Sequence, residues 1–507
     1  MSERGFEWDQ NRTIYETKYY TSKPMRKDMM LFLRASYFTP RSSSYSKESL
    51  SKLEKLIDQV VFSDVKFTSA LAWFLGHNMG IRLAPIIMTI KLSEKTKKKY
   101  LQQLVKDVFT RPDCIAHAFR YWKFTKGEII SFPKRVFPLL RKQLETFDKE
   151  TLKKQKMRRR EFKLKDLIKI LKPQPANSEM SKFYKEIIED GKESKISIST
   201  DKKFERLLRE EPELTQENIS EASIDTLVRS LPHIKPEYVE QVKTRLDSVF
   251  ESGQGFRFIH PFDLLILHEY VDCESDNCQQ MLDVLDQILV KYVQPQISAR
   301  RPVILYDRSI SMKQIGHRAG SKIIALMGNL FNSDFRFYTF ASKNSHLSNL
   351  PAGITDITDQ FRDLKSQGPN FIARYIKDSI TCFGGAELVN AIKWVIENNR
   401  RMDLFIIITN QTSFEESQIG EYQKVIPSRL CNRIFLINMN PSPKNILKLG
   451  KNIIQLPGLD SKLFQVIDAI INFDKFKKKI NAQFEARVSE EMRKRRASSI
   501  EEKSQLT

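Results

Sequence analysis

The stretch Pro302-Val303-Ile304-Leu305-Tyr306-Asp307-Arg308-Ser309-Ile310-Ser311 decides the fold of the last two-fifths of this 507-residue chain. Its first five residues form a short apolar run, which is typical of a buried strand in a parallel sheet. A carboxylate and two hydroxyls, spaced two residues apart, then stand at the carboxyl end of that strand. Open α/β sheets bind ligands at this edge, and hard oxygen donors suit Mg²⁺ or a similar divalent cation. The stretch therefore predicts a sheet domain with a candidate metal site made by Asp307, Ser309 and Ser311.

The residues after 302 alternate between strand-like and helix-like patterns. The expected strands lie at 303–306, 335–340, 404–409, 433–438 and 453–456, and the expected helices at 321–330, 386–398, 415–425 and 462–471. Strands that alternate with helices indicate a parallel, doubly wound sheet. We therefore predict an α/β domain over residues 302–474.

The chain before the linker at 294–301 shows a helical pattern. Apolar residues recur at 50, 53, 56, 57, 60 and 61, for example, which is the spacing of one buried helix face. Further short amphipathic segments are expected at 67–75, 101–109, 139–147, 162–171, 182–188, 239–250 and 281–293. So many short helices with almost no strand pattern predict a solenoid-like helical array over 26–293. Residues 1–25 are expected to be a flexible N-terminus.

Positive charge is concentrated near the beginning of the chain. The net charge is +22, and residues 1–200 hold 42 basic and 23 acidic residues, an excess of 19. Residues 201–300 are acidic, with 11 basic and 19 acidic residues. Such asymmetry favours a polyanionic partner, most often nucleic acid, and solvated helix faces are the alternative. The charged segment 475–507 predicts a basic tail, either a frayed helix or a nuclear-import or RNA-contacting patch.

Two basic segments and the residues between them are the candidate RNA contacts. The residues are Lys153, Lys154, Lys156, Arg158, Arg159, Arg160, Lys97, Lys98, Arg120 and Lys123. Each cation that neutralises a phosphate releases counterions, so binding should weaken steeply with salt. The interleaved Phe119, Tyr121, Trp122 and Phe124 either stack on unpaired bases or pack in the core.

The candidate metal site lacks two donors that A-type domains supply from other loops. The D-x-S-x-S spacing of Asp307, Ser309 and Ser311 resembles the metal motif of von Willebrand A domains. In that family a second loop gives a threonine and a third gives an aspartate, but Ala386 and Asn410 stand at these positions here. Fewer charged ligands lower cation affinity, so the site is expected to bind Mg²⁺ or another divalent cation weakly or not at all. The alternative is that the three residues hydrogen-bond neighbouring loop amides.

The order of motifs resembles the Ro autoantigen, or TROVE-module, family over roughly residues 25–475. The resemblance rests on Lys165-Asp-Leu-Ile-Lys-Ile-Leu-Lys-Pro173, Thr226-Leu-Val-Arg-Ser-Leu231 and Phe258-Ile-His-Pro-Phe262, followed by the A domain. It implies a ring of HEAT-like helical repeats followed and closed by a von Willebrand A-like domain. It also implies that the protein binds small structured or misfolded non-coding RNA and places 156–160 where the family carries RNA-contacting cations. Ile170 departs from the family, which has a histidine there.

We therefore expect a non-catalytic RNA-binding protein that works within a ribonucleoprotein. The alternative is a scaffold subunit of a larger ribonucleoprotein that docks other subunits through the top of the A domain. His260 precedes a proline in an apolar segment and reads as a structural histidine, so an enzyme is not expected. No apolar run approaches the roughly 18 residues of a membrane span, and no secretory signal is evident. The expected location is cytoplasmic, with a nuclear location as the alternative.

Overall fold

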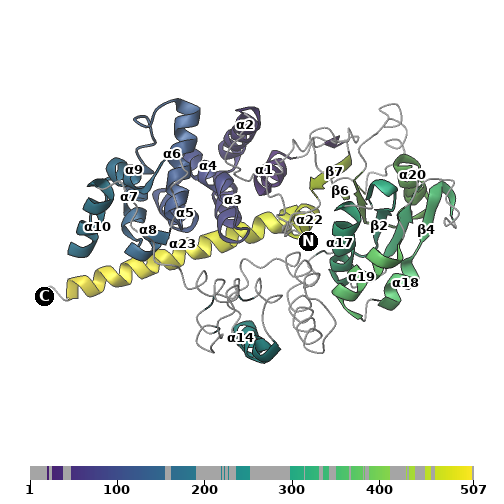
Figure 1. Cartoon of the computed structure of the whole chain (residues 1–507). Coiled ribbons are helices and arrows are strands. Elements are labelled where there is room, and N and C mark those ends of the chain that lie inside the picture. Colours follow the sequence, from purple (N-terminus) through teal and green to yellow (C-terminus); the bar gives the residue numbers. More distant parts are fainter. Residues whose placement is uncertain are drawn as a thin grey trace. The chain divides into compact units, whose positions relative to one another are not determined.

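The computed structural model of the chain divides into two compact units (Figure 1). The sheet unit comprises Met1–Met25 and Thr200–Asn472, and the helical unit comprises Arg26–Ser199 and Phe473–Thr507. The structure describes residues 20–21, 26–37, 47–154, 162–189, 219, 222, 227, 236–251, 297, 299–312, 315–330, 335–341, 350–364, 367–380, 382, 387–410, 430, 433–439, 452–457 and 463–504. These units differ from the predicted boundaries, because contacts group 200–293 with the A domain and 473–507 with the early helices.

The sheet unit is built on a seven-stranded sheet with the order β1-β7-β6-β5-β2-β3-β4. Its strands are β1 (Tyr20–Thr21), β2 (Pro302–Asp307), β3 (Arg336–Phe340), β4 (Ile354–Asp356), β5 (Leu404–Thr409), β6 (Ile434–Asn438) and β7 (Asn452–Pro457). The five strands from β7 to β3 are parallel, and the two edge strands β1 and β4 are antiparallel. All five strands expected after residue 302 are present, which confirms the doubly wound fold.

The helices of this unit explain why the central strands are apolar throughout. They are α14 (Val239–Glu251), α17 (Ile315–Leu330), α18 (Thr358–Leu364), α19 (Pro369–Ser379), α20 (Leu388–Asn398) and α22 (Leu463–Ile471), with 3-10 turns at Pro236–Tyr238, Ile310–Met312 and Pro351–Gly353. Every residue of β2, β5 and β6 is buried, as expected of parallel strands covered on both faces. The helix expected at 415–425 lies outside the described residues, as does the one at 281–293.

Close packing of α17 on β2 requires a glycine. A Cβ placed on Gly320 would lie 2.7 Å from the ring of Tyr306, which is fully buried. Apolar residues recur on α20 at 388, 391, 392 and 395, and that face joins the core formed by β2, β5 and β6. These contacts hold β2 rigidly, and so they position the carboxyl end of the strand.

The first 25 residues were expected to be flexible, but two of them join the sheet. Tyr20 and Thr21 pair antiparallel with Ile453 and Asn452 at the outer edge of β7. A two-residue strand has too little pattern to be found from sequence, since alternation needs at least four residues.

The helical unit is a layer of short helices, as the apolar spacing predicted. They are α1 (Lys27–Ser36), α2 (Lys47–Ser63), α3 (Val65–His77), α4 (Leu83–Leu92), α5 (Lys98–Val108), α6 (Pro112–Lys126), α7 (Phe137–Glu145), α8 (Lys149–Lys154), α9 (Leu164–Leu171) and α10 (Ser178–Glu189). Neighbours in sequence pack together, as α3 does with α4 and α9 with α10. This is the arrangement of a stacked helical array.

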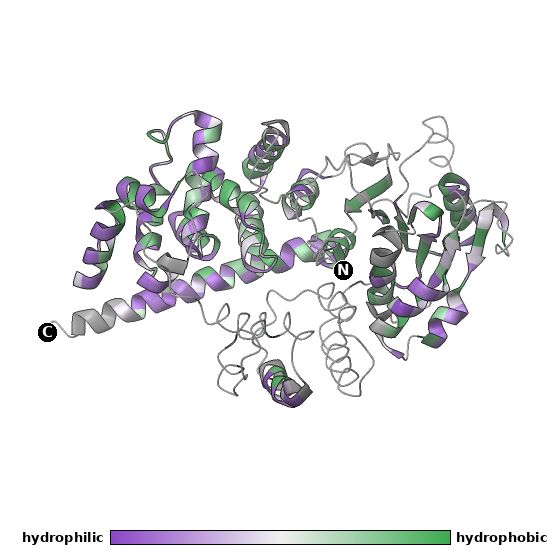
Figure 2. Cartoon of the chain, in the orientation of Figure 1, coloured by the Kyte–Doolittle hydropathy of each residue, from purple (hydrophilic) through white to green (hydrophobic). Residues whose placement is uncertain are grey.

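The predicted basic tail is instead part of a long, packed helix. Helix α23 (Phe473–Ser504) lies along α3 and α5 and places Phe473, Ile480, Phe484 and Val488 in the core of the helical unit. These four residues follow the helical period and form a narrow stripe. The rest of the helix is charged, so Figure 2 shows it as mostly hydrophilic with short hydrophobic bands. Of the two alternatives for the segment from 475, the structure shows a helix, which is packed as far as Val488 and exposed at 493–498.

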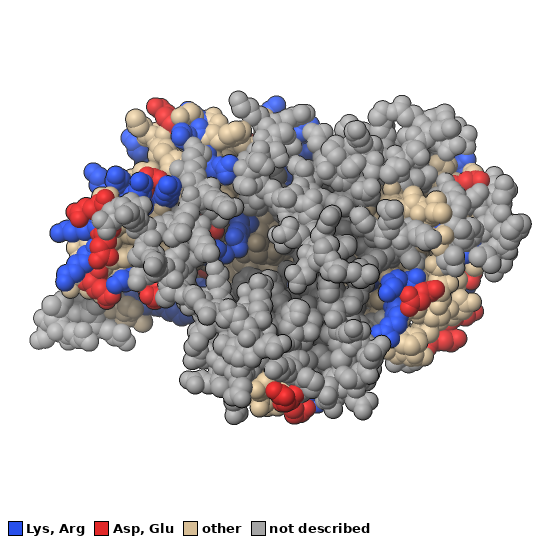
Figure 3. All heavy atoms as spheres, in the orientation of Figure 1, with Lys and Arg blue, Asp and Glu red and all other residues tan. Residues whose placement is uncertain are grey.

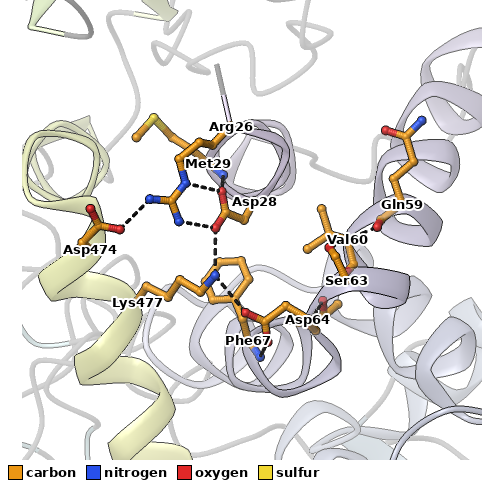
Figure 4. Close-up of polar contacts among 11 residues, drawn as sticks. Arg26, Asp28, Met29, Gln59, Val60, Ser63, Asp64, Phe67, Asp474 and Lys477 are labelled. Carbon is orange, nitrogen blue, oxygen red and sulfur yellow. Dashed lines mark hydrogen bonds and ion pairs between the residues drawn. The ribbon is translucent and has the colours of Figure 1, made fainter. Parts of the chain in front are cut away.

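A cluster of charged side chains around the buried Asp28 fixes the start of α23 against α1 and α3 (Figure 4). Lys477 Nζ lies 2.9 Å from Asp28 Oδ2 and 2.8 Å from Asp64 Oδ2. Arg26 contacts Asp28 at 2.7 Å and Asp474 at 2.6 Å. Burial by itself would raise the pKa of Asp28, but hydrogen bonds from Arg26 and Lys477 outweigh it and lower that pKa.

Candidate functional site

Asp307 ends β2 as a fully buried carboxylate. Its Oδ1 accepts a hydrogen bond from the backbone N–H of Ser309 at 2.7 Å, and its Oδ2 accepts one from the Thr409 hydroxyl at 2.6 Å. Thr409 ends the neighbouring strand β5, so the parallel pairing of β2 and β5 brings the two residues together. Burial raises the pKa of Asp307, and the hydrogen bonds from Thr409 and Ser309 offset only part of that rise.

The two serines of the motif are linked to each other and to the loop after β5. The hydroxyls of Ser309 and Ser311 lie 2.8 Å apart. Ser311 donates to Asn410 Oδ1 at 2.9 Å, while the Asn410 amide nitrogen donates to the Ser311 carbonyl oxygen. Asp307, Ser309, Ser311, Thr409 and Asn410 therefore form one hydrogen-bonded cluster at the carboxyl edge of the sheet, which we call the Asp307 cluster.

The donors of the Asp307 cluster suit this hydrogen bonding better than a divalent cation. The cluster contains one carboxylate, and both of its oxygens already accept hydrogen bonds. Asn410 supplies an amide where an aspartate would bring charge, and Ala386 lies outside the described residues. Among the residues that the structure describes, no group of three or more His, Cys, Asp or Glu side chains is placed to hold a metal ion.

Sequence reasoning missed Thr409, which is the partner of Asp307. A threonine at the last position of an apolar strand reads as an ordinary strand residue, because β-branched residues favour strands. Only the pairing of β2 with β5 places Thr409 beside Asp307, and a single sequence does not show which strands pair.

The surface beside the cluster is partly apolar. Ile310 stands between the two serines and is 60 % exposed. Arg308 is buried and donates to the Thr355 hydroxyl at 2.8 Å.

Six of the ten predicted RNA contacts have side chains that the structure does not describe. This applies to Lys156 and Arg158–Arg160, and the side chains of Lys153 and Lys154 are likewise not described. Lys97 and Lys98 are exposed at the start of α5, and Lys123 is exposed on α6. Arg120, also on α6, is half-buried.

Lys97 and Lys98 belong to a larger basic cluster, which we call the lysine cluster. It consists of Lys95, Lys97, Lys98, Lys99 and Arg135, all exposed. Arg135 joins it by donating to the Thr96 carbonyl oxygen at 2.9 Å. No acidic residue occupies the first turn of α5, so the positive end of the helix dipole adds to this charge. Elsewhere on the helical unit, Lys and Arg side chains lie among Asp and Glu side chains (Figure 3).

An exposed phenylalanine stands beside the lysine cluster. Phe62, in the last turn of α2, is 79 % exposed, and Lys95 Nζ lies 3.0 Å from its ring centroid. With so much of the side chain open, the ring face away from Lys95 is free to stack. Sequence reasoning missed Phe62, although its position gave a signal. It falls out of phase with the buried face that ends at Val60 and Val61.

The four interleaved aromatic residues of α6 divide between core and surface. Phe119 and Tyr121 are buried, and the Tyr121 hydroxyl donates to Glu54. Trp122 is half-buried, and Phe124 is 43 % exposed. Core packing therefore accounts for the first two, and Phe124 stays open to solvent.

The motifs that resemble the Ro family are only partly described. The segment 165–173 forms α9 and its end, where Lys172 adopts a left-handed φ of 49° before the buried Pro173. Leu227 is buried, while 258–262, including His260, lies outside the described residues. Within the described residues, no helix has the length and apolar character needed to span a bilayer.

Comparisons with known proteins bear on the fold. No family model matches the chain, and no curated protein matches it by sequence. Among solved structures, the crystal structure of the Deinococcus radiodurans Ro (RSR) protein is similar with a TM-score of 0.58 and 14 % identity. The match covers 88 % of this chain and 99 % of that one. The chain therefore has the fold of a Ro protein, a helical array together with a von Willebrand A-like α/β domain.

Proposed function

We propose that this chain is a Ro-like RNA-binding protein that acts by binding rather than by catalysis. The lysine cluster beside Phe62, on the helical part of a Ro-like fold, is the observation that carries the proposal. We further propose that the bound RNA is a small structured or misfolded non-coding RNA and that the two form part of a ribonucleoprotein. The proposed location is the cytoplasm, with the nucleus as the alternative.

The lysine cluster has the chemistry of a phosphate-binding surface. Four lysines occur within five residues, and Glu94 is the acidic residue next to them in sequence. Their mutual repulsion is relieved when a polyanion binds, and counterion release drives the association. Lysine ammonium groups bind phosphates as point charges without reading sequence.

Phe62 extends this surface from phosphates to bases. Every nucleobase has a π-face, so an exposed ring stacks on unpaired bases with little sequence preference, at about 1–3 kcal/mol per base. Lys95 against one face of the ring leaves the other face for a base. The pair favours a single-stranded end or loop over a continuous duplex, in which the bases are already stacked.

Charge reversal tests the proposal. RNA with a single-stranded 3′ tail should bind Lys97→Glu/Lys98→Glu about tenfold more weakly than the unaltered protein at low salt. The slope of log K against log salt should fall by about 1.4, since two single-strand phosphate contacts are lost. Lys182→Glu/Lys185→Glu on α10, where both lysines are exposed, makes the same change in charge and serves as the control.

Phe62→Ala separates stacking from charge. It should weaken binding of the tailed RNA by about tenfold, corresponding to roughly 1.4 kcal/mol, without changing the salt slope. Binding of a blunt duplex should be unaffected. The proposal is wrong if the unaltered protein does not bind the tailed RNA at low salt, or if the lysine-cluster variants and the α10 control bind it equally.

A scaffold role is the second candidate, favoured by the exposed Ile310. A large apolar side chain on a hydrogen-bonded loop suits docking to another ribonucleoprotein subunit. Ile310→Asp should then remove a partner from complexes isolated with the protein while leaving binding of the tailed RNA unchanged. We further propose that this docking edge works without a divalent cation, because the Asp307 cluster satisfies its own polar groups.

A further inference from the structure

A cavity of about 590 Å³ opens at the edge of the sheet opposite to the Asp307 cluster. It lies where β2 and β3 begin and α20 ends, and residues from these three elements line it. The two edges are separated by the length of β2, roughly 16 Å for six residues. The cavity therefore belongs neither to the Asp307 cluster nor to the lysine cluster.

Four arginines surround this cavity, which we call the arginine pocket. Arg301 and Arg336 come from the starts of β2 and β3, and Arg400 and Arg401 follow α20. All four are exposed. Glu397 is the acidic residue in the lining, so the lining carries a clear positive excess.

Nearby carboxylates compensate only part of this charge. Arg336 Nη1 lies 3.7 Å from Asp356 Oδ2, which is a loose ion pair. Asp403 accepts hydrogen bonds from the backbone N–H groups of Arg300 and Arg301, at 2.8 and 2.9 Å. Asp403 therefore fixes the chain beside the pocket through backbone bonds, which leave the Arg301 guanidinium available.

The end of α20 accounts for Arg400 and Arg401, but it does not account for the placement of all four arginines around one cavity. Cations just after a helix C-terminus are stabilised by the helix dipole, which accounts for Arg400 and Arg401. Arg301 and Arg336 stand at strand starts, where no such field acts. Placing all four around one cavity costs repulsion that a bound anion would relieve.

Behind the arginines the pocket is closed by the core of the sheet unit. Val303 and Met402 line it there, and each is only 2 % exposed. Guanidinium groups match phosphate oxygens in a bidentate way, so the accessible lining suits a phosphate group. The volume lies within the roughly 300–1,000 Å³ typical of small-ligand sites.

We propose that the arginine pocket binds the phosphate group of a nucleotide, either a free nucleotide or the 5′-phosphorylated end of an RNA. The four arginines hold the phosphate. This site goes beyond the proposed RNA contacts, because it lies in the other unit and does not depend on the lysine cluster.

Binding of ATP and of short RNAs, measured by calorimetry in EDTA, tests the proposal. ATP or a 5′-phosphorylated oligoribonucleotide should bind saturably, the RNA more tightly than its 5′-hydroxyl form. Arg400→Glu/Arg401→Glu should weaken that binding at least tenfold. Arg374→Glu/Lys377→Glu, an equal charge change at exposed positions of α19, should alter it less than twofold.

The outcomes distinguish the source of the nucleotide and the two sites. Binding of ATP indicates a free nucleotide, and preference for 5′-phosphorylated RNA without ATP binding indicates an RNA end. Lys97→Glu/Lys98→Glu should change neither ATP binding nor the preference for 5′-phosphorylated RNA. A defect in the lysine cluster can therefore be told apart from a defect in the arginine pocket. The proposal is overturned if neither probe shows the expected binding, or if both double variants bind equally while circular dichroism shows them folded.

Discussion

Two buried aspartates, one in each unit, have pKa values that are shifted in opposite directions. Asp28 in the helical unit lies between Arg26 and Lys477, and its pKa is lowered despite desolvation. Asp307 in the sheet unit is bonded to a backbone amide and a hydroxyl, and desolvation raises its pKa. Burial opposes ionisation at both sites, so nearby cations decide the direction of the shift.

The two carboxylates differ in the groups that compensate their charge. Asp28 is compensated within the protein, and the resulting ion pairs attach α23 to α1 and α3. Asp307 has no full positive charge among its hydrogen-bond partners, and a bound cation would supply one in an intact A-domain metal site. In this structure the donors to its two oxygens are the uncharged Ser309 N–H and the Thr409 hydroxyl.

The largest expected effect comes from removing the cation that Asp28 shares with Asp64. Lys477→Met keeps the aliphatic stem but leaves Asp28 with Arg26 alone. Removing one partner of a fully buried pair costs about 3–5 kcal/mol. We expect about 2 kcal/mol here, because Lys477 is 22 % exposed and Arg26 remains.

Hydrogen exchange of the α23 peptides measures this effect. Amides in the first turns of α23 should exchange about 30-fold faster, which corresponds to about 2 kcal/mol. Lys478→Met changes an exposed neighbour and should leave exchange unaltered. Equal exchange in the two variants would show that the apolar stripe alone holds the helix.

Neutralising either aspartate should have a smaller effect on the free energy of unfolding, and the two effects should differ in direction. Asp28→Asn should lower the free energy of unfolding of the helical unit by about 1–1.5 kcal/mol at pH 7. Asp307→Asn should leave the sheet unit unchanged or stabilise it by less than about 1 kcal/mol, because its amide can bond Ser309 and Thr409 without a buried charge.

The stability of the two units should also depend on pH in different ways. The pKa of Asp28 lies below its ordinary 3.8, so its contribution is present above pH 3.8 and disappears as the pH falls through the lowered value. The pKa of Lys477 lies above 10.5, so its contribution persists to pH 10.5 and is lost above it. For Asp307 the raised pKa reverses the sign, and the sheet unit loses stability as the carboxyl ionises. Hydrogen exchange of peptides from α1 and β2, measured at pH 4 and 7, checks this difference. If the stability of both units changed in the same way between these pH values, the opposite pKa shifts of Asp28 and Asp307 would be contradicted.

The smallest expected effect is that of magnesium. A site with Mg²⁺ at 100 times its Kd would gain about 2.7 kcal/mol of stability. We expect the Tm of the unaltered protein to differ by less than about 1 °C between 5 mM Mg²⁺ and EDTA. Ala386→Thr/Asn410→Asp restores the donor types of an A-domain site and should introduce a Mg²⁺-dependent rise in Tm. A large shift in the unaltered protein would show that the Asp307 cluster binds the cation after all.

The sheet could be predicted closely because its strands are buried on both faces. Runs such as 404–408 are apolar at every position, and helices between the strands, such as α20, carry regular apolar stripes. The helical layer could also be predicted, since helices such as Ser178–Glu189 bury one face at the helical period. For α23 a frayed helix was one of the alternatives, but its packing was missed because its buried stripe is narrow in a segment where charge dominates.

The candidate sites were less predictable because their residues come from distant parts of the chain. Lys477 meets Asp28 across 449 positions, and Thr409 meets Asp307 across 102. The arginine pocket joins Arg301, Arg336 and Arg401, which share no motif. Phe62 is the exception, because its phase within one helix already marked it as exposed.

By itself, the sequence determined the class of each region and the position of the D-x-S-x-S motif. Apolar period and charge are local properties, and they suffice to form strands, helices and a basic segment. Only the tertiary structure decided what compensates each buried charge. That outcome depends on which side chains lie within a few ångströms, and electrostatic energy falls with distance in space rather than along the chain. The same aspartate side chain therefore became an ion-pair partner at Asp28 and an acceptor of hydrogen bonds from uncharged donors at Asp307.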